Sequence, residues 1–265
     1  MAEARSRFWI WGHEAGSHDS GYDLPARSRM TPLEGAIYLG VPNLIMVGYN
    51  QRPRPPFEQY AVPLRCLDRV VWSIVGAGGT TAAAERAAVV RLAAREPNIT
   101  GVMMDDFFRA PAGAEADVGV LSPTELDGVR DQLAAVGRPL DLWVVLYDHQ
   151  LHLPVRDHLA RCDVVTFWTW EAPNLARLEA NFARAEALAG DRRKVLGCYL
   201  WDYGRRQPMP VTAMERQCET GLEWLRDGRI DGMIFLASCI CDLELEAVEW
   251  TRRWIARTGA GAVPD

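Results

Sequence analysis

The sequence predicts a single (β/α)8 barrel, or TIM barrel, of the α/β class. Short apolar runs alternate along the chain with amphipathic stretches of helical spacing, which is typical of a parallel sheet buried on both faces. The chain has 265 residues and eight such runs, and a barrel of this class takes about 250 residues. No Pro/Gly/Ser-rich linker interrupts the alternation, so residues 1–265 are predicted to form one domain.

The predicted strands share one pattern, an apolar and often aromatic run that stops at polar or acidic residues. The eight runs are Phe8–His13, Asn43–Asn50, Val70–Gly76, Ile99–Asp106, Leu140–His149, Val164–Glu171, Val195–Asp202 and Ile230–Ser238. Active sites of these barrels lie at the carboxyl ends of the strands. The polar strand ends are therefore expected to meet on one rim.

The predicted helices follow the strands in order. Three of them begin with a hydroxyl residue followed by glutamate three positions later, a capping-box pattern: Thr31–Glu34, Ser122–Glu125 and Thr212–Glu215. Other stretches are rich in Ala, Leu, Glu and Arg at helical spacing: Thr80–Arg95, Leu175–Ala189 and Leu243–Arg257. Only His152–Ala160 is available for the fifth helix, which is expected to be weak. Three long loops are expected on the active face: Glu14–Met30, Phe107–Leu121 and Tyr203–Val211.

Composition restricts the class of partner. With 49% hydrophobic and 24% charged residues, the chain has the composition of a soluble globular protein. Its net charge of -6 argues against nucleic acid and anionic membranes, because both need a concentrated basic face. Residues 1–7 are charged, and no run approaches the ~20 apolar residues of a membrane helix, so a cytoplasmic protein is expected.

No cofactor is predicted. The six cysteines lack metal-finger spacing and are expected to be reduced, buried thiols, and the pair at Cys239 and Cys241 is expected to serve packing. Gly76–Gly79 lacks both the dinucleotide fingerprint and the lysine of a P-loop, so a tight turn is expected there rather than a phosphate site.

The most informative feature is Asp105-Asp106, two adjacent carboxylates that end a buried strand. Strand alternation places Met103 and Asp105 on one side and the aliphatic Val102 and Met104 on the other. This pattern aims Asp105 into the barrel mouth, whereas Asp106, at the strand tip, is free to turn either way. The alternative interpretation is that the aspartates cap the following backbone or pair with an arginine such as Arg109.

Other strand ends supply further candidates. Glu171 and Asp202 add two acids, and cleavage of an acetal needs a pair of carboxyl groups, one kept protonated by burial and one ionised. The candidate catalytic residues are thus Asp105, Asp106, Glu171 and Asp202. His13, Asn50, Asp148 and His149 are candidate binding residues, and His149, next to Asp148, is the histidine best placed for proton transfer or a metal.

Aromatic residues gather near the same strand ends. Aromatic faces stack on the apolar faces of sugar rings, so tryptophans and acids at a barrel mouth suggest carbohydrate. The candidate stacking residues are Trp72, Tyr147, Trp168, Trp170, Trp201 and Tyr203. The alternative is that these aromatics fill the barrel interior, which holds layers of large side chains.

Three strand endings resemble those of the (β/α)8-barrel glycoside hydrolases: Gly101–Asp106, Trp168–Glu171 and Tyr199–Asp202. The resemblance implies an enzyme that hydrolyses a glycosidic bond in a small-molecule or oligosaccharide substrate with paired carboxylates. The chain also departs from known patterns. Chitinase-like enzymes would have a glutamate where Phe107-Phe108 stand, and the clan with two catalytic glutamates would have Glu at positions 106 and 202.

Two other functions fit the same residues. A metal-dependent sugar isomerase or epimerase would use Asp105, Asp148, His149 and Glu171 as ligands of a divalent ion. A non-catalytic sugar-binding barrel would keep the aromatic rim but lack a correctly spaced acid pair.

Overall fold

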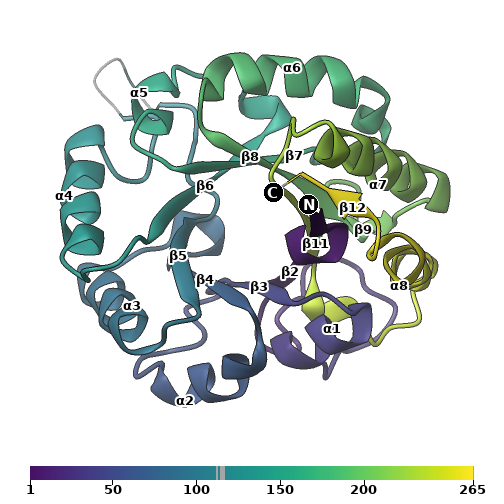
Figure 1. Ribbon diagram of the computed structural model, residues 1–265, viewed down its shortest axis with the longest axis horizontal. Coiled ribbons are helices and arrows are strands. Elements are labelled where there is room, and N and C mark those ends of the chain that lie inside the picture. The colour runs from purple at the N-terminus through teal and green to yellow at the C-terminus, as the bar shows by residue number, and fades with distance from the viewer. Residues whose placement is uncertain (112, 114–116, 265) are drawn as a thin grey trace.

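The protein folds as a closed barrel of eight parallel strands, in the order β11-β2-β3-β4-β5-β6-β7-β8. A computed structural model describes residues 1–111, 113 and 117–264. The strands form a ring that the helices surround (Figure 1). The barrel strands are β2 (Phe8–Gly12), β3 (Asn43–Met46), β4 (Arg69–Val75), β5 (Ile99–Met104), β6 (Asp141–Tyr147), β7 (Val164–Trp168), β8 (Arg193–Tyr199) and β11 (Gly232–Leu236). Each predicted run overlaps one of these strands, so the predicted fold class is confirmed.

Large aromatic residues fill the barrel interior. Trp9 packs edge-on against Trp143 with ring centroids 5.1 Å apart, and Trp11 packs against Trp168 at 5.3 Å. Glycine stands opposite these rings because nothing larger fits: a Cβ atom at Gly197 would lie 2.0 Å from the Trp168 ring. The aromatic-rich strands are thus explained largely by packing.

The described residues contain eight α-helices. They are α1 (Pro32–Leu39), α2 (Glu58–Ala61), α3 (Ala83–Arg95), α4 (Pro123–Ala134), α5 (Arg156–Leu159), α6 (Leu178–Ala189), α7 (Val211–Arg226) and α8 (Glu246–Thr258). The fifth helix is a single turn, as its sequence predicts. No helix in the described part of the chain is both long and apolar enough to cross a membrane.

Two of the three predicted capping boxes are present. Thr31 and Ser122 each accept a hydrogen bond from the backbone of the glutamate three residues on, and each glutamate returns the contact. The third prediction is wrong, because α7 starts at Val211 and its N-cap residue is Pro210, which has no side-chain cap. Pro210 already holds the extended backbone that precedes a helix, so Thr212 falls within the first turn.

Two short antiparallel pairs accompany the barrel. β1 (Ala2–Glu3) pairs with β12 (Ala262–Val263) and joins the two ends of the chain (Figure 1). β9 (Trp201–Asp202) pairs with β10 (Gln207–Pro208) in the loop after β8.

The six cysteines are free thiols. Five are buried, as expected, whereas the prediction is wrong for Cys66, which is exposed. Cys66 lies at the end of the short 3-10 segment after α2.

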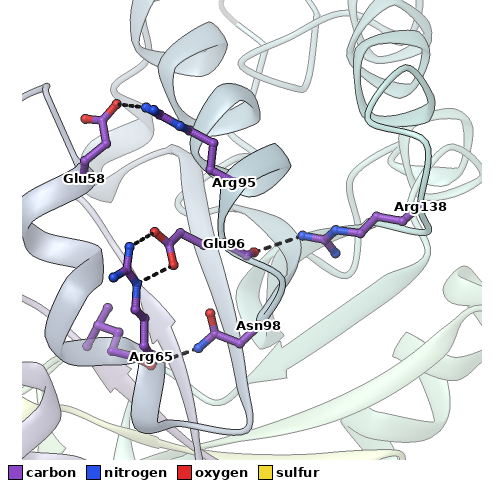
Figure 2. A network of polar contacts seen from close by, with 7 residues as sticks. Glu58, Arg65, Arg95, Glu96, Asn98 and Arg138 are labelled. Carbon is purple, nitrogen blue, oxygen red and sulfur yellow. Dashed lines mark hydrogen bonds and ion pairs between the residues drawn. The ribbon is translucent and has the colours of Figure 1, made fainter.

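A polar network holds the chain at the amino-terminal end of β5 (Figure 2). Glu96, which is 6% exposed, accepts hydrogen bonds from the Arg65 guanidinium at 2.8 and 2.6 Å. The Arg138 guanidinium donates to the backbone carbonyls of Ala93, Glu96 and Ile99 at 2.6, 3.1 and 2.7 Å. The network fixes the connection from α3 to β5 and so the position of the residues at the far end of that strand.

Candidate functional site

Asp105 and Asp106 lie at the carboxyl end of β5, and both line a small pocket at the barrel mouth. The pocket has a volume of about 50 Å³. Its lining residues are Trp11, His13, His18, Tyr22, Tyr49, Ala77, Asp105, Asp106, Tyr147, Trp170, Tyr199, Tyr203 and Leu236. Asp105 thus faces the mouth, as strand alternation predicts. Asp106 turns to the same pocket, because its backbone adopts a φ of 44°.

Asp105 is a buried carboxyl group whose surroundings favour its protonated form. It is 5% exposed, and its Oδ1 accepts a hydrogen bond from the Asp106 backbone N–H at 2.8 Å. Burial raises the pKa of Asp105 well above its usual range, and the nearby Asp106 carboxylate raises it further. Burial and a like charge both disfavour ionisation, so the surroundings of Asp105 favour the protonated carboxyl group, which is the form that can donate a proton.

Asp106 is held through both of its carboxylate oxygens. The Tyr147 hydroxyl donates to Oδ1 at 2.7 Å, and the Gly78 backbone N–H donates to Oδ2 at 2.7 Å. Gly78 lies in the predicted tight turn at Gly76–Gly79 and has a φ of 70°, a conformation that favours glycine. Asp106 is thus fixed in place by a donor on each oxygen. Within the described residues neither aspartate pairs with a cation, so pairing with Arg109 is not observed.

Two neutral histidines stand beside the acids. His13 Nδ1 lies 3.0 Å from the Val47 carbonyl oxygen, to which it must donate, and Nε2 accepts from Trp11 Nε1 at 3.1 Å. Burial lowers the pKa of His13 to about 4. Both ring nitrogens are therefore occupied, and His13 is a fixed wall of the pocket rather than a base.

His18 comes from the long loop Glu14–Met30, and its Nδ1 forms a hydrogen bond of 3.0 Å with the Tyr203 hydroxyl. Burial lowers the pKa of His18 well below its ordinary value. With His13 also neutral, the pocket presents uncharged imidazoles next to its two carboxyl groups.

Tyrosine hydroxyls complete the pocket. Burial raises the pKa of Tyr147, Tyr199 and Tyr203 well above 10.0, so these side chains stay neutral and offer hydroxyl groups to a ligand. Tyr22 covers one side, with its ring centroid 4.9 Å from that of Tyr203 and 5.0 Å from that of His18.

Of the candidates predicted from sequence, six line this pocket: Asp105, Asp106, His13, Tyr147, Trp170 and Tyr203. The candidates predicted from sequence do not include His18, Tyr22, Tyr49 and Tyr199, which also line the pocket. His18 and Tyr22 belong to a loop whose length had marked it as part of the active face. That length is the signal in the sequence for these two residues.

The other two candidate acids do not line the pocket. Glu171 has a side chain that is 40% exposed, and it forms an ion pair with Arg205 at 3.4 Å. Asp202 is fully buried and its Oδ1 accepts from the Arg205 backbone N–H at 3.2 Å. Neither Glu171, after β7, nor Asp202, after β8, therefore faces the Asp105-Asp106 pair in this pocket.

The remaining candidates have other surroundings. Trp72 packs against Phe57 at 5.4 Å, Trp168 packs inside the barrel, and Trp201 donates from Nε1 to the Tyr22 carbonyl at 3.1 Å. Asn50 is exposed in the loop after β3. These residues position the walls of the barrel and its loops without lining the pocket.

His149, the histidine that the sequence singles out for proton transfer or a metal, does not line the pocket. Its side chain is 57% exposed and stacks on the outer side of Tyr147, with ring centroids 5.3 Å apart. Asp148 accepts a hydrogen bond from the Trp170 backbone N–H at 3.2 Å, and His149 lies 3.7 Å from the same carboxylate oxygen. The chain turns into a 3-10 segment after Tyr147, which carries both residues away from the pocket.

The ligand set of a metal-dependent isomerase is not brought together. Among the described residues, no group of three or more His, Cys, Asp or Glu side chains is arranged to hold a metal ion. Asp105 faces the pocket, whereas Glu171 is engaged by Arg205 on the rim.

Comparisons with known proteins show the fold. No protein-family model matches the chain, and no curated protein matches its sequence. A chitinase domain from Pyrococcus furiosus, solved with chito-oligosaccharides, is 14% identical with a TM-score of 0.60 over 94% of this chain and 93% of that one. A GH5_18 protein from Streptomyces cattleya, solved with Manβ1-4GlcNAc, is 14% identical with a TM-score of 0.57 over 97% and 82% of the two chains.

The structural neighbours also include barrels with other chemistry. A type I 3-dehydroquinate dehydratase from Clostridium difficile is 7% identical, with a TM-score of 0.52 over 96% of this chain and 94% of that one. The likeness therefore establishes a TIM barrel with several glycoside hydrolases among its neighbours. The chemistry has to be argued from the site.

Proposed function

We propose that the barrel mouth hydrolyses the glycosidic bond of a 2-acetamido sugar, with Asp105 as the proton donor and Asp106 as the carboxylate that orients the acetamido group. The observation that carries the proposal is the pair of adjacent carboxyl groups, one buried with a raised pKa and the other held as an acceptor by Tyr147 and Gly78. Neighbours solved with chito-oligosaccharides and with Manβ1-4GlcNAc support this class of substrate.

The protonation state of Asp105 suits an acid catalyst. Cleavage of an acetal needs a proton on the leaving oxygen, and a carboxyl group whose pKa is raised by its surroundings still holds one at neutral pH. Burial raises the pKa of Asp105, and the residue lines the pocket where the leaving oxygen would lie.

The position of the acids favours assistance by the substrate. Enzymes that use two carboxyl groups hold them on opposite sides of the scissile bond, about 5 to 10 Å apart. Asp105 and Asp106 come from one strand end, and Glu171 and Asp202 do not line the pocket. A nucleophile from the opposite side must then belong to the substrate, and the acetamido oxygen of a 2-acetamido sugar is such a group.

The proposed reaction proceeds in two steps. In the first, Asp105 gives its proton to the glycosidic oxygen, the bond from C1 to that oxygen breaks, and the acetamido oxygen bonds to C1. Asp106 accepts a hydrogen bond from the acetamido N–H and offsets the positive charge that develops on the ring. In the second, water attacks C1, the bond from C1 to the acetamido oxygen breaks, and Asp105 takes a proton from the attacking water, so the acetamido group and the Asp105 carboxyl group are both restored.

The sugar has to displace part of the pocket wall. Pockets that hold small ligands measure about 300 to 1,000 Å³, much more than the 50 Å³ between these side chains. Tyr22 is the partly exposed member of the lining that comes from the long loop Glu14–Met30. Movement of Tyr22 would open the pocket next to Trp170, whose ring would then stack on the sugar.

The test is the hydrolysis of an aryl N-acetylglucosaminide and of chitotetraose by single variants. Asp105→Asn and Asp106→Asn should each lower kcat/KM by about 10³-fold, because they remove the proton donor and the orienting charge. The rate should also fall as pH rises through the raised pKa of Asp105. An aryl glucoside, which has a hydroxyl in place of the acetamido group, should not be turned over.

Glu171→Gln is the matched control, since it changes an acid on the rim that does not line the pocket. It should leave kcat/KM within about threefold of the unaltered protein, as a partly exposed ion pair contributes little. Loss of activity in Glu171→Gln equal to that in Asp105→Asn would replace our proposal with a two-carboxylate mechanism. Sugar binding without turnover in the unaltered protein would instead indicate a binding barrel.

A further inference from the structure

A larger groove of about 840 Å³ lies beside the mouth pocket on the same rim. Its walls are the loop after β3, the end of β4 and the start of α3, and they include Gln51, Arg54, Ser73, Thr80, Thr81 and Glu85. The turn Gly76–Gly79 separates the two cavities: Ala77 lines the mouth, whereas Gly76 and Gly79 line the groove. Gly78, in the same turn, holds the Asp106 carboxylate. A ligand in the groove would thus be separated from the proposed catalytic pair by this turn.

Two side chains of opposite charge face this groove, and neither forms a hydrogen bond or ion pair with another described residue. Arg54 is exposed and makes no hydrogen bond or ion pair with the residues that the structure describes. Glu85 is partly buried in the first turn of α3, and burial raises the pKa of its carboxyl group with no cation to offset the cost. A carboxylate that is partly desolvated and unpaired is unfavourable unless a ligand supplies hydrogen bonds.

The Ser73 hydroxyl in the groove also has an unused hydrogen-bond donor. Ser73 is 7% exposed, and its Oγ accepts from the Gly48 backbone N–H at 2.9 Å. Its own proton finds no acceptor in the described part of the chain. The groove therefore combines a free guanidinium, a free carboxylate and a hydroxyl donor.

This set of groups selects for a neutral polyhydroxylated ligand. An anion would be repelled by Glu85, and a cation by Arg54. Hydroxyl groups both donate and accept, so they can satisfy all three side chains at once.

We propose that the groove is a subsite for further sugar units of an oligosaccharide whose terminal unit occupies the mouth. The inference rests on the proposed function for the identity of the sugar, and it specifies that longer chains are the preferred substrates. Arg54 and Glu85 would bind the hydroxyl groups of the additional units, and Ser73 would donate to one of them.

The test measures binding separately from turnover. In the Asp105→Asn background, titration calorimetry should show that chitotetraose binds at least about tenfold more tightly than N-acetylglucosamine, because the longer sugar also contacts the groove. Adding Arg54→Ala or Glu85→Gln should remove about tenfold of the tetramer affinity and leave the monomer affinity unchanged.

Arg91→Ala is the matched control, because Arg91 is an exposed arginine of α3 that does not line the groove. It should leave both affinities unchanged. With Asp105 intact, Arg54→Ala and Glu85→Gln should lower kcat/KM for chitotetraose but not for an aryl N-acetylglucosaminide.

The outcomes separate this inference from the proposed function. Weaker tetramer binding in Arg54→Ala and Glu85→Gln, without turnover of any glycoside by the unaltered protein, would keep the groove and reject hydrolysis. Turnover that neither variant alters, or tetramer and monomer affinities that are equal, would keep hydrolysis and reject the groove. The absence of both binding and turnover would reject both.

Discussion

Two carboxyl groups at opposite ends of β5 are almost equally buried but have opposite electrostatic surroundings. Glu96, before the strand, is 6% exposed, and Asp105, after it, is 5% exposed. Arg65 binds both oxygens of Glu96 and lowers the pKa of that carboxyl. Asp105 has no cation in the described residues, and burial raises its pKa.

The difference separates a stabilising end of the barrel from a reactive one. A buried acid with a bidentate arginine is a structural element, whereas a buried acid without one keeps its proton and is poised for chemistry. Enzymes of this fold place chemistry at the carboxyl ends of the strands and stability at the other end. The two ends of β5 follow that division.

The largest change in stability is expected from Arg138→Ala, at the amino-terminal end of β5. Removing three hydrogen bonds to the carbonyls after α3 should lower the free energy of unfolding by about 2 kcal/mol, measured by urea denaturation. Arg95→Ala, which removes an exposed ion pair with Glu58 shown in Figure 2, should cost less than about 0.5 kcal/mol. Equal effects of the two variants would show that the network does not stabilise this end.

A smaller effect is expected from Tyr147→Phe, at the mouth. The variant removes the hydroxyl that donates to Asp106 Oδ1 at 2.7 Å, and kcat/KM should fall about tenfold, with little change in stability. Steady-state kinetics and a melting curve on the same sample measure the two quantities. A loss of stability with unaltered kinetics would place Tyr147 with the structural residues instead.

The smallest effect is an increase in stability from Asp105→Asn. Because the folded-state pKa of Asp105 is raised, its ionisation opposes folding: stability is fully present below the ordinary value of 3.8 and is lost as pH rises through the folded-state pKa. Asn keeps the acceptor for the Asp106 N–H without the charge. The variant should therefore be more stable than the unaltered protein at pH 7 and no more stable below about pH 4, measured by denaturation across pH.

The contribution of Glu96 to stability depends on pH in the opposite direction. Its pKa is lowered, so its contribution to stability is present above the ordinary value of 4.5 and is lost as pH falls through the folded-state pKa. If Asp105→Asn and the unaltered protein showed the same stability at every pH, the contrast between the two ends of β5 would lack an energetic basis.

The amino-acid sequence was sufficient to predict the barrel and the face on which its polar strand ends gather. Apolar period, strand count and helix caps are local signals, and side-chain alternation along Ile99–Met104 was enough to aim Asp105 into the mouth. Local signals were less reliable where a neighbouring residue offers another start for the helix. The N-cap residue of α7 is Pro210, not the predicted Thr212.

Which polar residues share the pocket depends on how the barrel and its loops pack together. Glu171 and Asp202 end strands just as Asp105 does, but Arg205 engages Glu171 and the short β9–β10 pair buries Asp202. His18 and Tyr22 reach the mouth because a long loop folds back over it, next to Tyr203 from the other end of the chain. The pKa of a carboxyl group depends on burial and on charges from distant segments, and these are set only when the barrel closes.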